Sequence, residues 1–138
     1  MSSWKTTRRI WDISQTLRPG LPVWPGDTAF AFDRTWKMED GSPVNVGRMT
    51  MSTHSGTHGD APLHYSPTAP DIASVALDPY LGECLVVDAT GVSGGRISVG
   101  DLPHIDSADR VLFRTFKRFP HDDWDSSFTA IDAEAIEW

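Results

Sequence analysis

The sequence predicts a strand-rich α/β protein with a single domain, and its length, its prolines and glycines, its helix pattern and its composition carry this prediction. A length of 138 residues suffices for one ordinary core but not for two domains of usual size. Ten prolines and eleven glycines divide the chain into short segments, and no helical periodicity persists before residue 98. The best helix pattern comes at the end, in residues 131–138. A composition of 39% apolar and 22% charged residues is typical of a globular protein.

Four segments read as strands, because they are rich in β-branched or aromatic residues and are bounded by turn formers. They are RIWDIS (9–14), VNVGRMTMST (44–53), CLVVDAT (84–90) and RVLFRT (110–115). Residues 17–30, LRPGLPVWPGDTAF, should run irregularly, since three prolines there lack an amide donor and fix φ. GVSGG (91–95) should turn the chain between strands, and its spacing does not match a dinucleotide-binding loop.

Two helical segments are expected late in the chain. Ser98, with Asp101 three residues on, can cap a short turn that Pro103 soon disturbs. In IDAEAIEW, Asp132 can cap and Glu134 suits the first turn. This helix would have fewer than two turns and no glycine or asparagine cap after it, so we expect the natural protein to continue and this chain to lack its C-terminal segment.

Charge and composition narrow the classes of partner and compartment. Twelve basic and nineteen acidic side chains give a net charge of −7 without a basic cluster, which argues against a nucleic-acid partner. No apolar run is long enough to span a membrane or to form a secretory signal, so we expect a cytoplasmic protein with no membrane contact. A single cysteine, Cys84, excludes an intrachain disulfide, and we expect it to be a small core residue.

Three of the five histidines and an aspartate, His54, His58, Asp60 and His64, lie within eleven residues. A helix would place positions 54 and 58 on one face, but Gly56 between them and Gly59 and Pro62 after them oppose a helix. In a roughly extended loop all four positions share even parity and can project to one side. The glycines would then let the backbone bend so that the side chains converge.

Two imidazoles and a carboxylate form a ligand set suited to Zn²⁺, with manganese or iron as alternatives. Three protein ligands leave one position open for water, which a metal ion activates for hydrolysis. Asp60 could also bridge a second ion, and His64 is either a fourth ligand or a proton carrier. The competing interpretation is a group of ordinary surface or core histidines in a glycine-rich loop. A serine hydrolase is disfavoured, because neither Ser52 nor Ser55 lies in a G-x-S-x-G elbow.

The remaining two histidines, His104 and His121, lie without companion ligands and are expected at the surface. Neither is a candidate site residue.

The segment HSGTHGDAPLH (54–64) resembles the H-x-G-T-H-x-D-A-P-x-H signature of the metal-dependent cyclase family, and the combination of motifs resembles its bacterial kynurenine formamidase branch. Further similar segments cover most of the chain: WDISQTL, LPVWPGDTAF, YLGECLVVDAT, RVLFRT and WDSSFTAI. The resemblance implies a swivelling β/β/α cyclase-like fold over residues 1–138, a homodimer or larger homo-oligomer, and two Zn²⁺ ions per subunit in the complete protein, with Mn²⁺ possible.

Carried over by motif position, the resemblance implies that His54, His58 and Asp60 are metal ligands, with Asp60 bridging both ions. It implies that His64 is the general acid/base and that Trp24, in VWPGD, lines the substrate pocket. Ordinary packing of Trp24 is the alternative, since the chain has six tryptophans. The family draws another histidine and a glutamate from a C-terminal part that this chain does not contain.

The implied reaction is hydrolysis of N-formyl-L-kynurenine to L-kynurenine and formate in tryptophan degradation, and it belongs to the complete protein. Two alternatives stay open at this point. The substrate could be another aryl amide or a cyclic amide, or the chain could be a non-catalytic truncated fragment that binds metal weakly or not at all.

Overall fold

The computed structural model describes residues 9–102 and 108–137. Within them the chain forms six short strands, one α-helix and five single-turn 3-10 helices, and it divides into two compact units, Met1–Gly59 and Asp60–Trp138. The strands are β1 Ala31–Trp36, β2 Val46–Thr50, β3 Leu85–Asp88, β4 Arg96–Ile97, β5 Val111–Arg114 and β6 Ala130–Ile131. The helices are α1 Ala133–Glu137, η1 Met38–Asp40, η2 Pro62–His64, η3 Ile72–Ser74, η4 Asp78–Tyr80 and η5 Val99–Asp101.

This mixture of strands with few helices agrees with the α/β class predicted from the sequence. The swivelling β/β/α arrangement and the single domain over 1–138 stay predictions.

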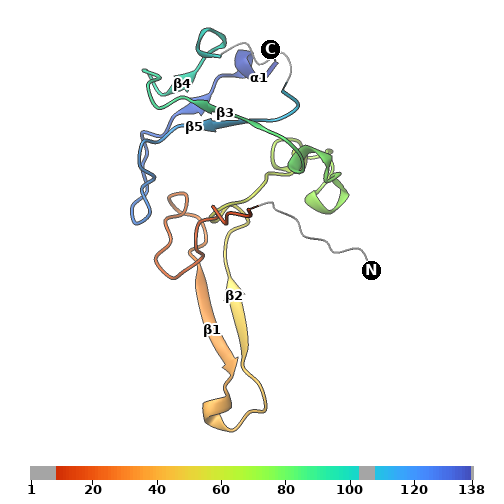
Figure 1. Cartoon of the computed structure of the whole chain (residues 1–138). Coiled ribbons are helices and arrows are strands. Elements are labelled where there is room, and N and C mark those ends of the chain that lie inside the picture. Colours follow the sequence, from red (N-terminus) through yellow and green to blue (C-terminus); the bar gives the residue numbers. More distant parts are fainter. Residues whose placement is uncertain (1–8, 103–107, 138) are drawn as a thin grey trace. The chain divides into compact units, whose positions relative to one another are not determined.

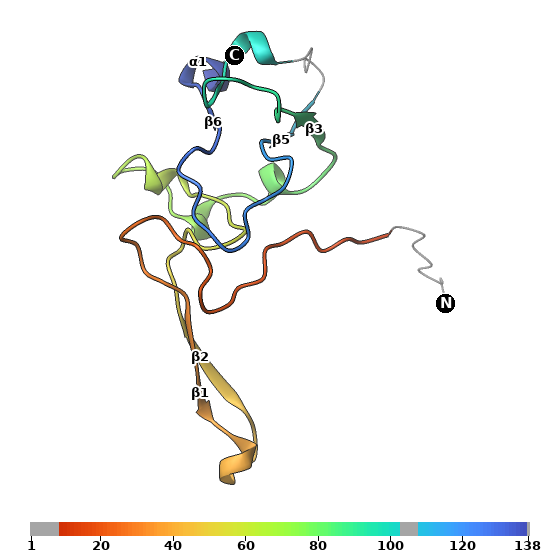
Figure 2. The ribbon, with the colours of Figure 1, turned by 90° about the vertical axis from the view of Figure 1, so that its left-hand side faces the viewer.

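The first unit contains an antiparallel hairpin in which β1 and β2 lie side by side with η1 in the connection (Figures 1 and 2). Phe32 pairs with Met49, and the ring of Phe32 lies over Gly47, where a Cβ would be 2.4 Å from two ring carbons. On the opposite face Asp33 pairs with Arg48. Both strands are exposed along their whole length, so the backbone ladder holds the hairpin together and cross-strand side-chain pairs add to it.

Residues 17–30 precede the hairpin and run as turns, as predicted. The N–H of Leu21 donates to the Arg18 carbonyl, and the N–H of Asp27 donates to the Trp24 carbonyl. Leu21 and Phe30 are the buried apolar side chains of this unit among the described residues. The irregular segment therefore supplies its apolar core.

The strand predicted for residues 9–14 is wrong. These residues form no strand, and Ile10, Trp11 and Ile13 are exposed. The Asp12 carboxylate accepts a hydrogen bond of 2.9 Å from the N–H of Ser14. Such a local side-chain bond competes with strand pairing for the backbone, and the apolar pattern alone did not reveal it.

Two parallel strand pairs organise the second unit. Strand β3 pairs with β5 from Leu85↔Val111 to Asp88↔Arg114, and β4 pairs with β6 over two residues. Val87, Ala89 and Ile97 are buried and form the centre of this unit among the described residues. The strands predicted in residues 84–90 and 110–115 are thus confirmed, as is the turn at 91–95. The short strands β4 and β6 were not predicted.

Both predicted helical segments are present. Ser98 donates from its N–H and from its hydroxyl to the Asp101 carboxylate at the start of η5, which holds the pKa of Asp101 below its ordinary value. Helix α1 directly follows β6 (Figure 2) and begins after Asp132, whose carboxylate accepts from the N–H of Ala133. The expectations for Pro103, His104 and Trp138 lie outside the described residues.

Two expectations about exposure have different outcomes. Cys84 is exposed, so the prediction of a small core residue is wrong; the residue comes just before β3, where the chain enters the sheet from a surface turn. His121 is exposed, as predicted. None of the helices in the described part of the chain has the length and apolar character needed to cross a bilayer.

Candidate metal centre

The loop that follows β2, residues 52–58, is called the histidine loop here. It reverses direction in a turn closed by the hydrogen bond from the N–H of Ser55 to the carbonyl of Ser52, at 3.2 Å. Gly56 has φ of +65°, a left-handed conformation that glycine adopts without steric cost. A Cβ at this position would also be 2.8 Å from Cδ2 of Leu17. The turn therefore needs glycine at position 56 for both its backbone conformation and its packing.

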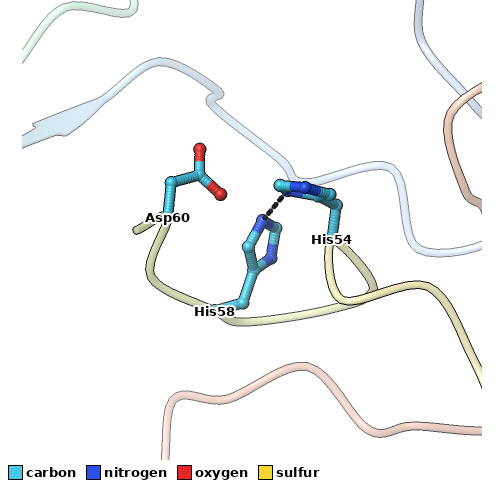
Figure 3. A group of neighbouring side chains, drawn as sticks. All are labelled: His54, His58 and Asp60. Atoms are coloured by element: carbon cyan, nitrogen blue, oxygen red, sulfur yellow. Dashed lines mark hydrogen bonds between the residues drawn. The ribbon is translucent and has the colours of Figure 1, made fainter. Parts of the chain in front are cut away.

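This turn brings His54 and His58 together, and Asp60 lies next to them (Figure 3). Nδ1 of His54 is 3.3 Å from Nε2 of His58, and the two rings meet edge to face at 82°. One ligand atom from each of the three residues lies within 4.8 Å of the other two. His54 is half-buried, and the other two side chains are exposed. The centre is thus open to solvent on the side of His58 and Asp60.

The hydrogen bond of Nδ1 shows which nitrogen of the neutral His58 ring carries the proton. Nδ1 of His58 lies 2.9 Å from the carbonyl oxygen of Gly56, which can only accept a hydrogen bond. Nδ1 therefore carries the proton in the neutral ring, and Nε2 presents its lone pair toward His54. Metal-binding histidines in proteins are oriented by this kind of second hydrogen bond.

The donor set fits a divalent metal ion. Two imidazole nitrogens and a carboxylate are the ligands that Zn²⁺ takes in catalytic sites. Two metal–nitrogen bonds of about 2.0–2.1 Å at a tetrahedral angle place their nitrogens about 3.3 Å apart. The separation between the His54 and His58 nitrogens is 3.3 Å. The two imidazoles are therefore spaced as ligands of one ion would be.

A second set of contacts fixes the start of the histidine loop. Ser52 is buried, and its hydroxyl donates to Oδ2 of Asp27 at 2.5 Å, while its oxygen accepts from the N–H of His54 at 3.1 Å. The bond from Ser52, followed by one from the N–H of Thr28, holds the pKa of Asp27 below its ordinary value. Sequence reasoning missed Asp27 and Ser52, because no pattern links residues twenty-five positions apart.

The other end of the loop is held from residues 15–17. The N–H of Gln15 donates to the Thr57 hydroxyl at 3.0 Å, and Leu17 lies against Gly56. Between the two ends, Ser55 is buried, and its hydroxyl has no hydrogen-bond partner among the described residues. The loop is thus anchored before His54, at Ser52, and again just before His58, at Gly56 and Thr57.

The remaining predicted site residues lie as follows. His64 ends η2, with its ring edge to face with Tyr65 at 4.5 Å between centroids, and it is not one of the three clustered residues. Trp24 is exposed at the start of the turn that leads to Asp27. The expectation of a roughly extended loop is wrong, because a tight turn brings the first two histidines together. The bend expected at the glycines is present at Gly56.

Comparison with known proteins adds to this geometry. The family described as "Putative cyclase" matches residues 11–138. The chain is 72% identical over 138 residues to a kynurenine formamidase of Erythrobacter litoralis (strain HTCC2594), covering all of this chain and 63% of the relative. Kynurenine formamidases of Maricaulis maris (strain MCS10) and Sphingopyxis alaskensis (strain DSM 13593 / LMG 18877 / RB2256) are 54% and 49% identical over 131 residues, covering 94% of this chain and 62% of each relative.

The chain therefore spans slightly less than two thirds of the length of these relatives. The family match nevertheless extends over nearly all of it, including the whole histidine loop and Asp60. On this match and these identities, the chain belongs to the cyclase family.

Proposed function

We propose that the whole protein is a metal-dependent amidohydrolase that converts N-formyl-L-kynurenine to L-kynurenine and formate in tryptophan degradation. The observation that carries the proposal is the cluster of His54, His58 and Asp60, whose ligand atoms lie within 4.8 Å of one another. The substrate is taken from the relatives, which are named kynurenine formamidases and are 49–72% identical to this chain.

His54, His58 and Asp60 would hold the metal ion, Zn²⁺ in the first instance with Mn²⁺ as the alternative. Two ions per subunit are proposed for the complete protein, with Asp60 between them. A bound divalent ion supplies Lewis-acid activation of water and of a carbonyl group. The hydrogen bond from His58 to the Gly56 carbonyl supports this role, because it fixes the ring with Nε2 available as a ligand.

His64 is proposed as the general acid. Hydrolysis adds the oxygen of water to the formyl carbon and breaks the bond between this carbon and the anilide nitrogen. The nitrogen must gain a proton to leave as an amine, and histidine is the side chain that most often delivers such a proton. Its place in the motif, four residues after Asp60, supports the assignment. Trp24 is proposed to stack on the aryl ring of the substrate, a contact worth about 0.5–1.5 kcal/mol.

A homodimer acting in the cytoplasm completes the proposal. An isolated two-stranded hairpin is marginally stable in water. Strands β1 and β2 nevertheless expose Phe32, Trp36 and Met49. A second subunit covering these side chains would stabilise the hairpin.

The test is a comparison of metal content and turnover in the full-length protein. His58→Ala should abolish retention of Zn²⁺, measured by elemental analysis after gel filtration. His64→Ala should retain the metal and lower kcat for N-formyl-L-kynurenine by about 10² to 10⁴. His121→Ala, which changes an exposed histidine outside the cluster, is the control and should alter neither quantity.

Three results would contradict the proposal. Equal loss of metal in the His58 and His64 variants would refute the division of roles. Faster turnover of isatin-like or hydantoin-like cyclic amides than of N-formyl-L-kynurenine would refute the substrate. Absence of bound zinc or manganese at neutral pH, with activity insensitive to chelators, would refute the metal centre.

A further inference from the structure

The contact between Asp27 and Ser52 joins two segments of the first unit that are far apart in the sequence. A serine hydroxyl has one hydrogen to donate, and Ser52 donates it to Oδ2 of Asp27 at 2.5 Å. The same oxygen accepts the N–H of His54 at 3.1 Å. The orientation of the Ser52 hydroxyl is therefore set by the Asp27 carboxylate, and the backbone of His54 is tied to that hydroxyl.

Asp27 is itself held in place. Its Oδ1 accepts the N–H of Thr28 at 2.6 Å, and its own N–H donates to the Trp24 carbonyl at 2.9 Å. A further backbone bond runs from the N–H of Ser52 to the Thr28 carbonyl at 3.3 Å. The carboxylate is thus a fixed point in the turn at 24–28, to which the start of the histidine loop is attached.

Direct metal binding is not the role that this geometry gives Asp27. Both carboxylate oxygens already accept hydrogen bonds, from Thr28 and from Ser52. Asp27 is also not a member of the group formed by His54, His58 and Asp60. Asp27 can instead control the position of the His54 backbone, and with it the position of the His54 imidazole.

We propose that Asp27 is a positioning residue for the metal centre, acting through the Ser52 hydroxyl to hold the His54 backbone so that Nδ1 stays beside Nε2 of His58. The proposal rests on the metal centre of the proposed function but not on the identity of the substrate. Without the Ser52 hydroxyl the N–H of His54 loses its acceptor, and the histidine loses the anchor that precedes the turn at Gly56.

Ser52 and Ser55 offer a matched pair of variants. Both are buried serines of the same loop, at 8% and 2% exposure, and both become alanine by loss of one oxygen. The Ser52 hydroxyl makes two hydrogen bonds, whereas the Ser55 hydroxyl has no partner among the described residues. A general effect of changing a buried serine would appear in both variants, and an effect of positioning would appear only in Ser52→Ala.

The experiment is a titration of the metal-free, full-length protein with Co²⁺, followed by the visible absorption of the bound ion. Ser52→Ala should lower the affinity about 10- to 100-fold, as loss of a contact behind a metal ligand commonly does. Ser55→Ala should bind Co²⁺ as tightly as the parent. Asp27→Asn should also weaken binding, since the single amide oxygen cannot accept from both Thr28 and Ser52. A variant with both Ser52→Ala and Asp27→Asn should bind Co²⁺ as tightly as the single variant of lower affinity does, because both substitutions remove the same contact.

A second measurement keeps the proposal testable if a variant folds poorly. In the metal-free protein, hydrogen exchange at the His54 amide should be faster in Ser52→Ala than in Ser55→Ala. Equal Co²⁺ affinity in Ser52→Ala and the parent, or unchanged exchange at His54, would overturn the proposal. Tight Co²⁺ binding by a parent protein that does not hydrolyse N-formyl-L-kynurenine would refute the function and leave the positioning test intact. A parent that binds no Co²⁺ would overturn both.

Discussion

The β1–β2 hairpin and the histidine loop are neighbours in the sequence, but the hairpin exposes apolar side chains whereas the loop buries polar ones. The hairpin exposes aromatic and aliphatic residues, among them Phe32, Trp36 and Met49. The loop that begins two residues after β2 buries two serines, Ser52 and Ser55. A hydropathy scale would predict the opposite, with the apolar side chains of the hairpin buried and the serines of the loop exposed.

The difference lies in how the backbone of each region is satisfied. In the hairpin, ladder bonds between the strands pair the backbone groups, so the side chains are not needed for this purpose. A tight turn has no ladder, and its N–H and carbonyl groups need other partners. In the histidine loop the Ser52 hydroxyl provides one such partner, as the acceptor for the N–H of His54, while Thr57 accepts from the N–H of Gln15 and ties the loop to residues 15–17. Ser52 is therefore buried where its oxygen serves the backbone of the turn, whereas the hairpin, whose ladder pairs its backbone, leaves its large apolar side chains exposed.

The largest effect that would sharpen this comparison is expected from Gly56→Ala. An L-residue in the left-handed conformation costs about 1–2 kcal/mol. The added Cβ would also displace the Leu17 side chain. We expect the free energy of unfolding, measured by urea denaturation, to fall by about 1–2 kcal/mol. Gly91→Ala is the control, because its Cβ would enter open space and its φ is not left-handed. Equal effects at both glycines would show that the turn does not depend on the conformation of Gly56.

The next largest effect is expected from Ser55→Ala, with the opposite sign. A buried hydroxyl without a partner costs about 1–3 kcal/mol. Removing it should raise the free energy of unfolding by about 1 kcal/mol, since the small space left behind offsets part of the gain. Ser52→Ala, measured in the same way, should be destabilising, because it removes an acceptor from the His54 amide. Destabilisation by both substitutions would indicate that Ser55 has a partner after all.

The sequence predicted those parts of the fold that depend on local patterns. The strands near residues 46–50, 85–88 and 111–114 carry β-branched or aromatic residues between turn formers, and Ser98 and Asp132 carry their capping signals. Strands β4 and β6 are two residues long, too short for any alternation to be visible. At residues 9–14 the β-branched and aromatic residues were present, but the local bond between Asp12 and Ser14 takes up a backbone N–H that a strand would pair.

The candidate site divides in the same way. His54, His58 and Asp60 lie within seven residues, so their grouping could be predicted from spacing, and the glycines indicated a bend but not the tight turn at Gly56. Asp27 reaches this loop from twenty-five residues away through a single hydroxyl. Serine and aspartate are common in turns, so nothing in the sequence distinguishes this pair from others.

The smallest effect is expected on the hairpin itself, from Asp33→Asn. The carboxylate of Asp33 lies 3.0 Å from Nη2 of Arg48 on the paired strand, but the two side chains are 64% and 68% exposed. Exposed ion pairs contribute about 0.2–1 kcal/mol, and water screens this one on both sides. We expect the free energy of unfolding, measured by urea denaturation at low salt, to fall by about 0.3 kcal/mol, near the lower limit of this range. The loss should vanish in 1 M NaCl, where the Debye length is about 3 Å. A loss that persists at high salt would mean that the neutral hydrogen bond contributes and not the charge. A loss above 1 kcal/mol would mean that side-chain pairs, and not the backbone ladder, hold the hairpin, and the contrast with the histidine loop would fail.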